Sequence, residues 1–343
     1  ARLRDRIGSV AWGDTDAALD SLRSGLAAAR AEKAGDGVEG RRVFVGMERT
    51  NEKGNEGVRA MPADPPAVGL MIKATVLDTP FLDVMVRHMI AQARYPFAER
   101  AIIVDRPQVF AGKYATRPRS SDAELDAVLD VLVKDGVVDH VREVDRGQES
   151  VERVTAQYFT GPGQLIPTHA SSGGPVYATL FGLESMSTDF IVQMGADVLF
   201  HTGPAYWGSR GLQCMAADPR LWLMMTHPGP PAGPPGRSIG PDNRLRAIWD
   251  PALGIWRFRH ATTRYFLCDR RTLRHRLPFV PDVGGCAPLE QCVSKALQQH
   301  GAFRGNIGDL QSWHLHVWDH GGPFPAWAAS LAKAVETGVY PAV

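Results

Sequence analysis

The sequence predicts an α/β protein in which a mostly parallel central sheet is flanked by helices. From residue 67 onward, short apolar runs alternate with amphipathic helical patterns, and strands separated by helices of this length form parallel sheets. The run at residues 190–194 is mainly apolar and has the length of a buried strand. Hydrophobic residues make up 44% of the chain and charged residues 22%, as in soluble globular proteins.

The first 66 residues predict an N-terminal extension of helical and irregular structure. Leu19, Leu22 and Leu26 lie on one stripe of an amphipathic helix expected over residues 16–33. The following stretch is rich in Gly, Glu, Asn and Pro and contains one short strand candidate at 43–47. We therefore treat this part as separate from the main α/β region.

The α/β region begins with a strand at 68–76 and a helix at 81–93, before which Asp78, Thr79 and Pro80 supply a cap and a first-turn proline. Ser121 and Glu124 form the sequence pattern of a capping box, and Gly136 ends that helix. Further strands are expected at 101–104, 137–144, 190–194, 198–200, 218–226 and 265–268. Further helices are expected at 176–186, 289–300 and 326–336. The Pro- and Gly-rich segment 228–241 is either a lid or a passive surface loop.

Composition narrows the classes of function. The 38 basic and 37 acidic residues leave a net charge of +1, which argues against nucleic-acid binding. No apolar stretch approaches the roughly 20 residues of a membrane span, and we expect a cytoplasmic protein with four free, mostly buried cysteines. The phosphate-binding P-loop and the Gly-x-Ser-x-Gly pattern of hydrolases are both absent from the sequence.

Asp197 is the first candidate for chemistry. It follows the apolar run 190–194 and the turn residues Gly195 and Ala196. Ligands of α/β proteins bind beyond the carboxyl ends of the strands, where a carboxylate can meet a metal ion or a sugar hydroxyl. An ordinary loop aspartate at a strand end is the alternative.

A family resemblance adds to this interpretation. The Gly-containing segment 172–174, the helical residues 177–183 and the strand that leads to Asp197 resemble the central part of family-2-type glycosyltransferases with the GT-A fold, including bacterial members. The resemblance covers roughly residues 67–320, by the order of elements more than by identity. It implies a Rossmann-like nucleotide-sugar-binding half at 67–200 and an acceptor-binding half with a C-terminal tail at 201–343.

The same resemblance implies a divalent cation, Mg²⁺ or Mn²⁺, but the metal motif is incomplete. The family usually has an acid where this chain has Gly195, so only Asp197, the final acid of the motif, is matched. The second metal ligand is expected from His314 or His316, which would share one face of a strand. An aromatic- and His-rich edge strand that serves only packing is the alternative.

Other roles follow from the resemblance residue by residue. Glu290, at the start of a helix, matches the general base of the family, and Asp282 is the fallback. Asp105 matches the position that contacts the nucleoside, and Arg264 could pair with the diphosphate. A first-turn glutamate, a strand-end aspartate and a surface arginine are the corresponding structural alternatives.

The expected function is transfer of a sugar from a UDP-, GDP- or TDP-linked donor to a small-molecule or glycan acceptor, with inversion and with help from a divalent metal. The first alternative is a nucleotidyltransferase acting on sugar phosphates. The second is a non-catalytic protein that binds nucleotides or carbohydrates, an option that Gly195 keeps open. Trp207, Trp249, Trp256 and Trp313 could stack on a sugar or serve as core residues.

Overall fold

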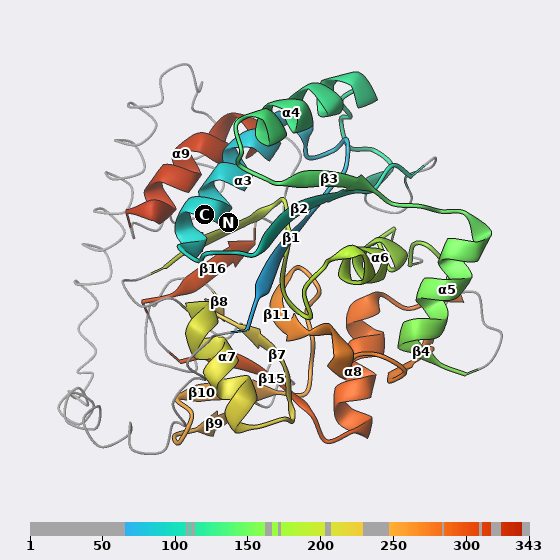
Figure 1. Ribbon diagram of the computed structural model, residues 1–343, viewed down its shortest axis with the longest axis vertical. Coiled ribbons are helices and arrows are strands. Elements are labelled where there is room, and N and C mark those ends of the chain that lie inside the picture. The colour runs from blue at the N-terminus through green and yellow to red at the C-terminus, as the bar shows by residue number, and fades with distance from the viewer. Residues whose placement is uncertain are drawn as a thin grey trace, which may run out of the picture.

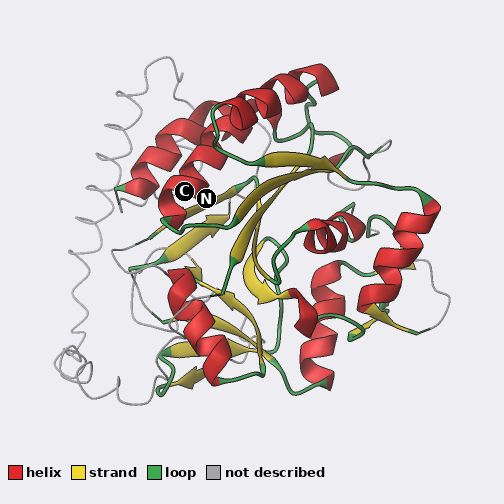
Figure 2. Ribbon diagram, viewed as in Figure 1, coloured by secondary structure: helices red, strands yellow, loops and turns green. Residues whose placement is uncertain are grey.

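A computed structural model describes residues 66–107, 110, 114–161, 167–170, 173–202, 207–228, 247–282, 285–308, 311–316 and 324–337. The helix predicted at 16–33, the strand predicted at 43–47 and all but the first residue of the loop 228–241 lie outside these ranges. The described residues form a mixed sheet flanked by helices (Figures 1 and 2), which confirms the predicted fold class.

The centre of the fold is a nine-stranded sheet with the strand order β3-β2-β1-β5-β11-β7-β15-β10-β9. Its strands are β1 (Val68–Ala74), β2 (Glu99–Val104), β3 (His140–Glu143), β5 (Phe190–Gly195), β7 (Leu221–Met225), β9 (Ile248–Asp250), β10 (Ile255–Phe258), β11 (Tyr265–Asp269) and β15 (Phe303–Ile307). Strands β3, β2, β1 and β5 are mutually parallel, whereas β11 and β10 run against their neighbours. The sheet is therefore mostly parallel and takes strands from both sides of residue 200.

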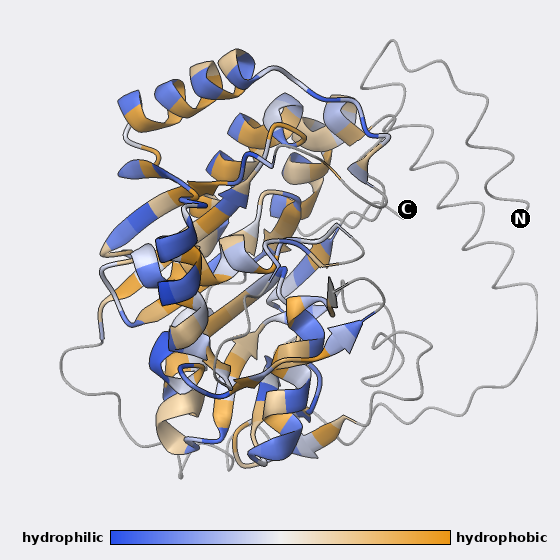
Figure 3. Cartoon of the chain, turned by 90° about the vertical axis from the view of Figure 1, so that its right-hand side faces the viewer, coloured by the Kyte–Doolittle hydropathy of each residue, from blue (hydrophilic) through white to orange (hydrophobic). Residues whose placement is uncertain are grey.

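Helices cover both faces of this sheet. In Figure 1, α3 and α9 lie on one side of β1 and β2, while α6 and α5 lie on the other. The helices are α3 (Thr79–Ala93), α4 (Asp122–Lys134), α5 (Gln148–Tyr158), α6 (Tyr177–Ser185), α7 (Trp207–Ala217), α8 (Leu289–Gln299) and α9 (Phe324–Glu336). Hydrophilic and hydrophobic residues alternate along several of them in Figure 3, as expected for helices with one face on the core.

A second sheet of three strands, with the order β6-β16-β8, lies beside the carboxyl end of β5. It contains β6 (Val198–His201), β16 (Trp313–His316) and β8 (His227–Pro228). Strand β16 is antiparallel to β6, with His316 opposite Val198. Because β6 starts directly after Asp197, this pairing brings residues 313–316 to the turn that follows β5.

Shorter elements complete the fold. They are the paired strands β4 (Phe159–Thr160) and β12 (Leu277–Pro278), the hairpin strands β13 (Pro281–Asp282) and β14 (Gly285–Cys286), and the 3-10 turn η2 (Arg270–Thr272). The four cysteines are free and buried, as predicted. Within the described ranges, we find no helix whose length and apolar character would let it cross a membrane.

The capping signals are confirmed in one helix and corrected in another. Ser121 caps α4 in a complete capping box with Glu124, and Gly136 follows the helix with a φ of 66°. Helix α3 begins at Thr79 with Pro80 in its first turn, but the Asp78 side chain does not cap it. Its Oδ2 atom instead accepts hydrogen bonds from the backbone N–H and hydroxyl group of Thr75. Asp78 therefore closes the turn after β1.

Candidate functional site

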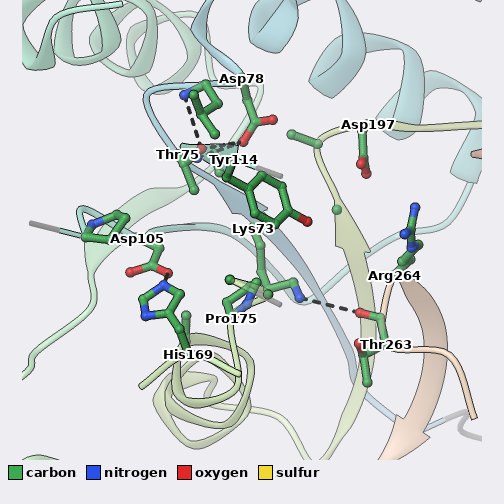
Figure 4. Close-up of a pocket in the computed structure, with 18 of the residues that line it drawn as sticks. Lys73, Thr75, Asp78, Asp105, Tyr114, His169, Pro175, Asp197, Thr263 and Arg264 are labelled. Atoms are coloured by element: carbon green, nitrogen blue, oxygen red, sulfur yellow. Dashed lines mark hydrogen bonds and ion pairs between the residues drawn. The ribbon is translucent and has the colours of Figure 1, made fainter. Parts of the chain in front are cut away.

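A cavity of about 480 Å³ opens at the carboxyl ends of β1, β2 and β5. Four residues singled out from the sequence line it, namely Asp105, Asp197, Arg264 and Glu290. They come from the residue after β2, the turn after β5, the segment before β11 and the first turn of α8. Figure 4 shows Asp105 on one side of this cavity, and Asp197 and Arg264 on the other. Residues that are far apart in the sequence thus meet at one edge of the sheet.

Asp197 occupies the space that a side chain at position 195 would need. A Cβ atom added to Gly195 would lie 2.6 Å from Oδ1 of Asp197, which is too close for an unchanged carboxylate. The other carboxylate oxygen, Oδ2, lies 2.9 Å from Nε2 of His316. Gly195, which stands where the metal motif usually has an acid, therefore leaves room for the carboxylate of Asp197.

His316 also contacts Arg264. The Nη1 atom of Arg264 makes close contacts with both ring nitrogens of His316. The His316 and Asp197 side chains are largely buried, with 12% and 17% of their surfaces exposed. Asp197, His316 and Arg264 thus form one group in which an imidazole lies between a carboxylate and a guanidinium.

His314 lies in a different environment from His316. Its Nδ1 atom is 3.0 Å from the hydroxyl oxygen of Thr226, and its ring packs against Tyr265. Burial, together with the nearby charge of Arg304, lowers the pKa of His314 to about 3, so the imidazole is neutral at pH 7. Neither His314 nor His316 lines the cavity with Asp197, and both histidines line a second cavity beside it.

The donor atoms around Asp197 can be compared with the needs of a divalent cation. Among the described residues, no group of three His, Cys, Asp or Glu side chains is close enough to hold a metal ion. Asp197 and His316 supply two donor side chains. Mg²⁺ is often held by only one or two carboxylates and takes its other ligands from phosphates and water, so Asp197 meets its main requirement, and the imidazole of His316 is the less usual member of such a pair.

Lys73 is a site residue that sequence reasoning missed. It lies near the carboxyl end of β1 and lines the cavity, and its Nζ atom donates a hydrogen bond to the Thr179 hydroxyl at 2.8 Å. Nζ also donates to the Thr263 carbonyl at 3.4 Å, as Figure 4 shows. Burial lowers the pKa of Lys73 to about 8, while the nearby Asp197 and Glu290 carboxylates favour its charged form. At neutral pH Lys73 therefore carries a positive charge inside the cavity.

Asp105 lies at the opposite end of the cavity, where two side chains hold its carboxylate. Arg146 forms an ion pair with Oδ1, and Nε2 of His169 lies 3.2 Å from Oδ2. Burial and the neighbouring Arg146 lower the pKa of His169, which favours its neutral imidazole. Only 3% of Asp105 is exposed, and its carboxylate is fixed in orientation.

Glu290 lies where the two cavities meet, because it lines both of them. It is in the first turn of α8, and its Oε1 atom accepts weak hydrogen bonds from the Thr263 N–H at 3.3 Å and the Thr262 hydroxyl at 3.4 Å. The fallback residue, Asp282, is exposed in β13 and lines neither cavity. Of these two acids, only Glu290 can reach a ligand in either cavity.

Aromatic residues of the cavity come from the segment after β2, which sequence reasoning left unassigned. Tyr114 lines the cavity, with the Arg117 guanidinium 4.8 Å from its ring centre, and burial raises the Tyr114 pKa. None of the four tryptophans considered from the sequence lines the cavity; Trp207 and Trp313 are buried in the core. A Tyr among Arg residues in a polar segment carries no periodicity, and for this reason no pattern predicted it.

No protein-family model matches the sequence, and no curated protein matches it at a significant level. Solved structures similar to the chain include three that bind nucleotides or nucleotide sugars. GalNAc-T7 with UDP, GalNAc and Mn²⁺ has 11% identity and a TM-score of 0.45, over 79% of this chain and 48% of that one. Mannosyltransferase PcManGT from Pyrobaculum calidifontis, with GDP-Man and Mn²⁺, has 14% identity and a TM-score of 0.41, over 81% and 76%. UDP-glucose pyrophosphorylase with UDP-glucose has 9% identity and a TM-score of 0.40, over 78% and 98%.

Proposed function

We propose that the protein transfers a sugar from a nucleotide-sugar donor to a small-molecule or glycan acceptor. One observation carries the proposal: Lys73, Asp105, Asp197, Arg264 and Glu290 line one cavity at the carboxyl ends of the strands. This position is where α/β proteins bind their ligands. The cavity combines acidic groups for a cation or hydroxyl with basic groups for phosphates.

Departure of the nucleoside diphosphate requires positive charge at the diphosphate. Arg264 lines the cavity beside Asp197, and a guanidinium can bind two phosphate oxygens at once. Lys73 adds a second positive charge, held in place by the Thr179 hydroxyl. These two residues would orient the diphosphate and stabilise the charge that develops as the sugar leaves.

Asp197 and His316 would hold the Mg²⁺ or Mn²⁺ ion. Such a cation, when bound, neutralises charge on the diphosphate leaving group. The 2.9 Å contact between the two side chains keeps both donor groups together, where Asp197 lines the donor cavity and His316 lines the cavity beside it. Arg264 contacts the same imidazole and would bind the diphosphate beside this pair. His314, bonded to Thr226, supports this strand without joining the donor set.

The acceptor hydroxyl must lose a proton during transfer, and Glu290 is the group we assign to this task. Its carboxylate faces both cavities and makes only weak hydrogen bonds to Thr262 and Thr263. A carboxylate so placed can accept the proton from a hydroxyl in the second cavity while the donor occupies the first. Attack from the side opposite the leaving group gives inversion at the sugar.

The nucleoside would occupy the end of the cavity beside Asp105. The Asp105 carboxylate is fixed by Arg146 and His169, and Tyr114 offers an aromatic surface nearby. A fixed carboxylate can accept hydrogen bonds from ribose hydroxyls or from a base N–H. The donor nucleotide, UDP, GDP or TDP, is thereby recognised at the end of the cavity away from Asp197.

Product analysis tests the proposal. The protein is incubated with UDP-, GDP- and TDP-sugars and Mn²⁺, and we expect release of the free nucleoside diphosphate. Asp197→Asn should reduce this release by about 10²-fold or more, since the variant loses a charge that acts on the leaving group. Asp189→Asn is the matched control, because Asp189 precedes the other end of β5 and pairs with Arg270. Full activity in a folded Asp197→Asn variant contradicts the assignment.

Two other functions give different products in the same assay. A nucleotidyltransferase would form pyrophosphate from a nucleoside triphosphate and a sugar phosphate. A non-catalytic binding protein would bind UDP in calorimetry without Mn²⁺ and release no product. Glycosyl transfer alone predicts a nucleoside diphosphate together with a glycosylated acceptor.

A further inference from the structure

A second cavity, of about 450 Å³, lies next to the proposed donor cavity and shares Arg264 and Glu290 with it. Its walls come from the three-stranded sheet, from the end of β7 and from β15. Arg304, on β15, is the basic residue of this cavity that the proposed reaction does not use. Its surroundings identify the kind of group that the cavity can bind.

Arg304 is buried in an unusual way for an arginine. Only 9% of the residue is exposed, and its guanidinium lies 4.4 Å from the ring centre of Phe258 on the neighbouring strand. Its side chain makes no hydrogen bond or ion pair to any described residue, and its Nε atom is buried without an acceptor. A buried charge without a partner costs free energy, so natural proteins usually pair it.

Arg257, on the adjacent strand β10, follows this rule. Its Nε atom lies 2.9 Å from Oδ2 of Asp250, and its Nη1 atom lies 2.7 Å from Oδ2 of Asp218. Two carboxylates therefore compensate this guanidinium. Arg304 has the aromatic contact but lacks the carboxylates, so its charge remains uncompensated among the described residues.

The side chain of Arg304 is positively charged at neutral pH, and no ion pair with a described residue neutralises it. Burial lowers the pKa of Arg304 to about 10, which keeps the side chain protonated at neutral pH. Glu290 is close enough to favour the charged form, yet forms no ion pair with it. Arg264 and Glu290 also line the second cavity, and Arg304 adds a positive charge that no described carboxylate pairs.

We propose that Arg304 binds a carboxylate or phosphate group carried by the acceptor, in the second cavity. The acceptor role rests on the proposed function, because Glu290 lies between this cavity and the donor cavity. An anion held by Arg304 would place a nearby acceptor hydroxyl beside Glu290. A guanidinium is suited to both kinds of oxyanion, since it donates several hydrogen bonds in one plane.

Anion binding is tested on the full chain without any donor or acceptor. Inorganic phosphate and acetate, at constant ionic strength, are titrated while the unfolding temperature and the binding heat are measured. We expect saturable binding of at least one anion to the wild-type protein and a loss of at least tenfold in affinity in Arg304→Met. The matched control is Arg259→Met, because Arg259 is exposed and its guanidinium also lies over an aromatic ring, that of Phe303, at 5.4 Å.

Arg304→Gln serves as a second variant if Arg304→Met does not fold. The preference between phosphate and acetate shows which oxyanion the cavity takes. UDP binding in the presence of Mn²⁺ should be the same in the wild type and in all three variants. If the wild type does not bind UDP at all, that result contradicts the proposed function and leaves the anion site untouched. Equal anion affinity in the wild type and in the folded Arg304 variants overturns the proposal, as does the absence of saturable anion binding.

The acceptor role is then tested with matched alcohols. Glycerol 3-phosphate, glycerate and glycerol are compared as stimulators of nucleoside diphosphate release. We expect a charged alcohol to stimulate release in the wild type and Arg259→Met but not in Arg304→Met. Equal stimulation by glycerol overturns the acceptor assignment while leaving nucleotide-sugar turnover intact.

Discussion

His316 lies 2.9 Å from Asp197, measured from Nε2 to Oδ2, although 119 positions separate the two residues in the sequence. Strand β16 brings the histidine there by pairing with β6, which begins one residue after Asp197. The side chains that the proposed cation would need thus come from two sheets. This contact distinguishes the two histidines of the predicted metal site, which share one strand.

Replacement of each histidine should have a different effect. We expect His316→Ala to weaken Mn²⁺-dependent activity by about 10- to 100-fold, because it removes the partner of Asp197. His314→Ala should instead lower the unfolding temperature, because it removes the Thr226 hydrogen bond and the Tyr265 contact. Mn²⁺ titrations of activity separate the two effects. A larger loss of Mn²⁺ affinity in His314→Ala than in His316→Ala would reverse the assignment.

Gly195→Ala should disturb the site without changing any polar group. The added methyl would lie 2.6 Å from Oδ1 of Asp197, so the carboxylate must shift, and its contact with His316 changes with it. We expect about a tenfold loss in Mn²⁺-dependent turnover, similar to the loss of a supporting contact. The control is Gly147→Ala, which places a methyl 3.1 Å from the Asp145 carboxylate, away from the cavity. Wild-type Mn²⁺ dependence in Gly195→Ala would show that the orientation of Asp197 is unimportant.

Glu290→Gln tests the proposed general base. The amide keeps the shape and the weak hydrogen bonds to Thr262 and Thr263 but cannot take a proton. We expect kcat to fall by about 10²- to 10⁴-fold while UDP affinity stays unchanged. Glu143→Gln, on the exposed end of β3, provides a surface control. Unchanged kcat in Glu290→Gln would assign proton removal to another group.

Lys73 should make the stability of the protein depend on pH in alkaline solution. Burial lowers its pKa from the usual 10.5 to about 8, so the unfolded chain binds more protons than the folded protein between these values. The free energy of unfolding of the wild type, relative to Lys73→Met, should therefore rise from pH 8 to 10.5, by up to about 3 kcal/mol. Urea denaturation at pH 7, 8, 9 and 10 measures this difference. A difference that stays constant or falls would contradict burial of a charged Lys73.

The capping box of α4 predicts an effect on stability alone. The Ser121 hydroxyl accepts a hydrogen bond from the Glu124 N–H at 3.2 Å, and the Glu124 carboxylate accepts one from the Ser121 N–H at 2.7 Å. Ser121→Ala should lower the free energy of unfolding by about 1 kcal/mol, measured in urea, without affecting activity. Asp130→Ala, farther along the same helix, should change it by less than about 0.5 kcal/mol. Equal effects of the two variants would indicate that the cap contributes little.

Patterns local in the sequence were predictable. The apolar run before Asp197 is strand β5, and the Ser121 and Glu124 pattern is a capping box. Helix α5 was overlooked even though Val151, Val154 and Tyr158 form a buried stripe, because Gly147 supplies no capping side chain. Apolar runs and capping residues therefore identified strands and helices, whereas a helix without a capping side chain was missed although its buried residues are regularly spaced.

Residues whose role depends on burial or distant partners were not predictable. Strand β15 carries Arg304 and Asn306 inside a fully buried run, which breaks the apolar pattern typical of central strands. Lys73 likewise interrupts an apolar strand and gives no hint of its contact with Thr179. The approach of His316 to Asp197 depends on strand pairing between distant segments, which no spacing rule encodes.

The pairing of β16 with β6 also determines when the site can exist during synthesis. His316 is the 119th residue that a ribosome adds after Asp197, and β16 must then leave the exit tunnel before it can pair. Lys73, Asp105 and Asp197 are all made much earlier. The carboxylate of Asp197 is therefore synthesised well before the imidazole that contacts it.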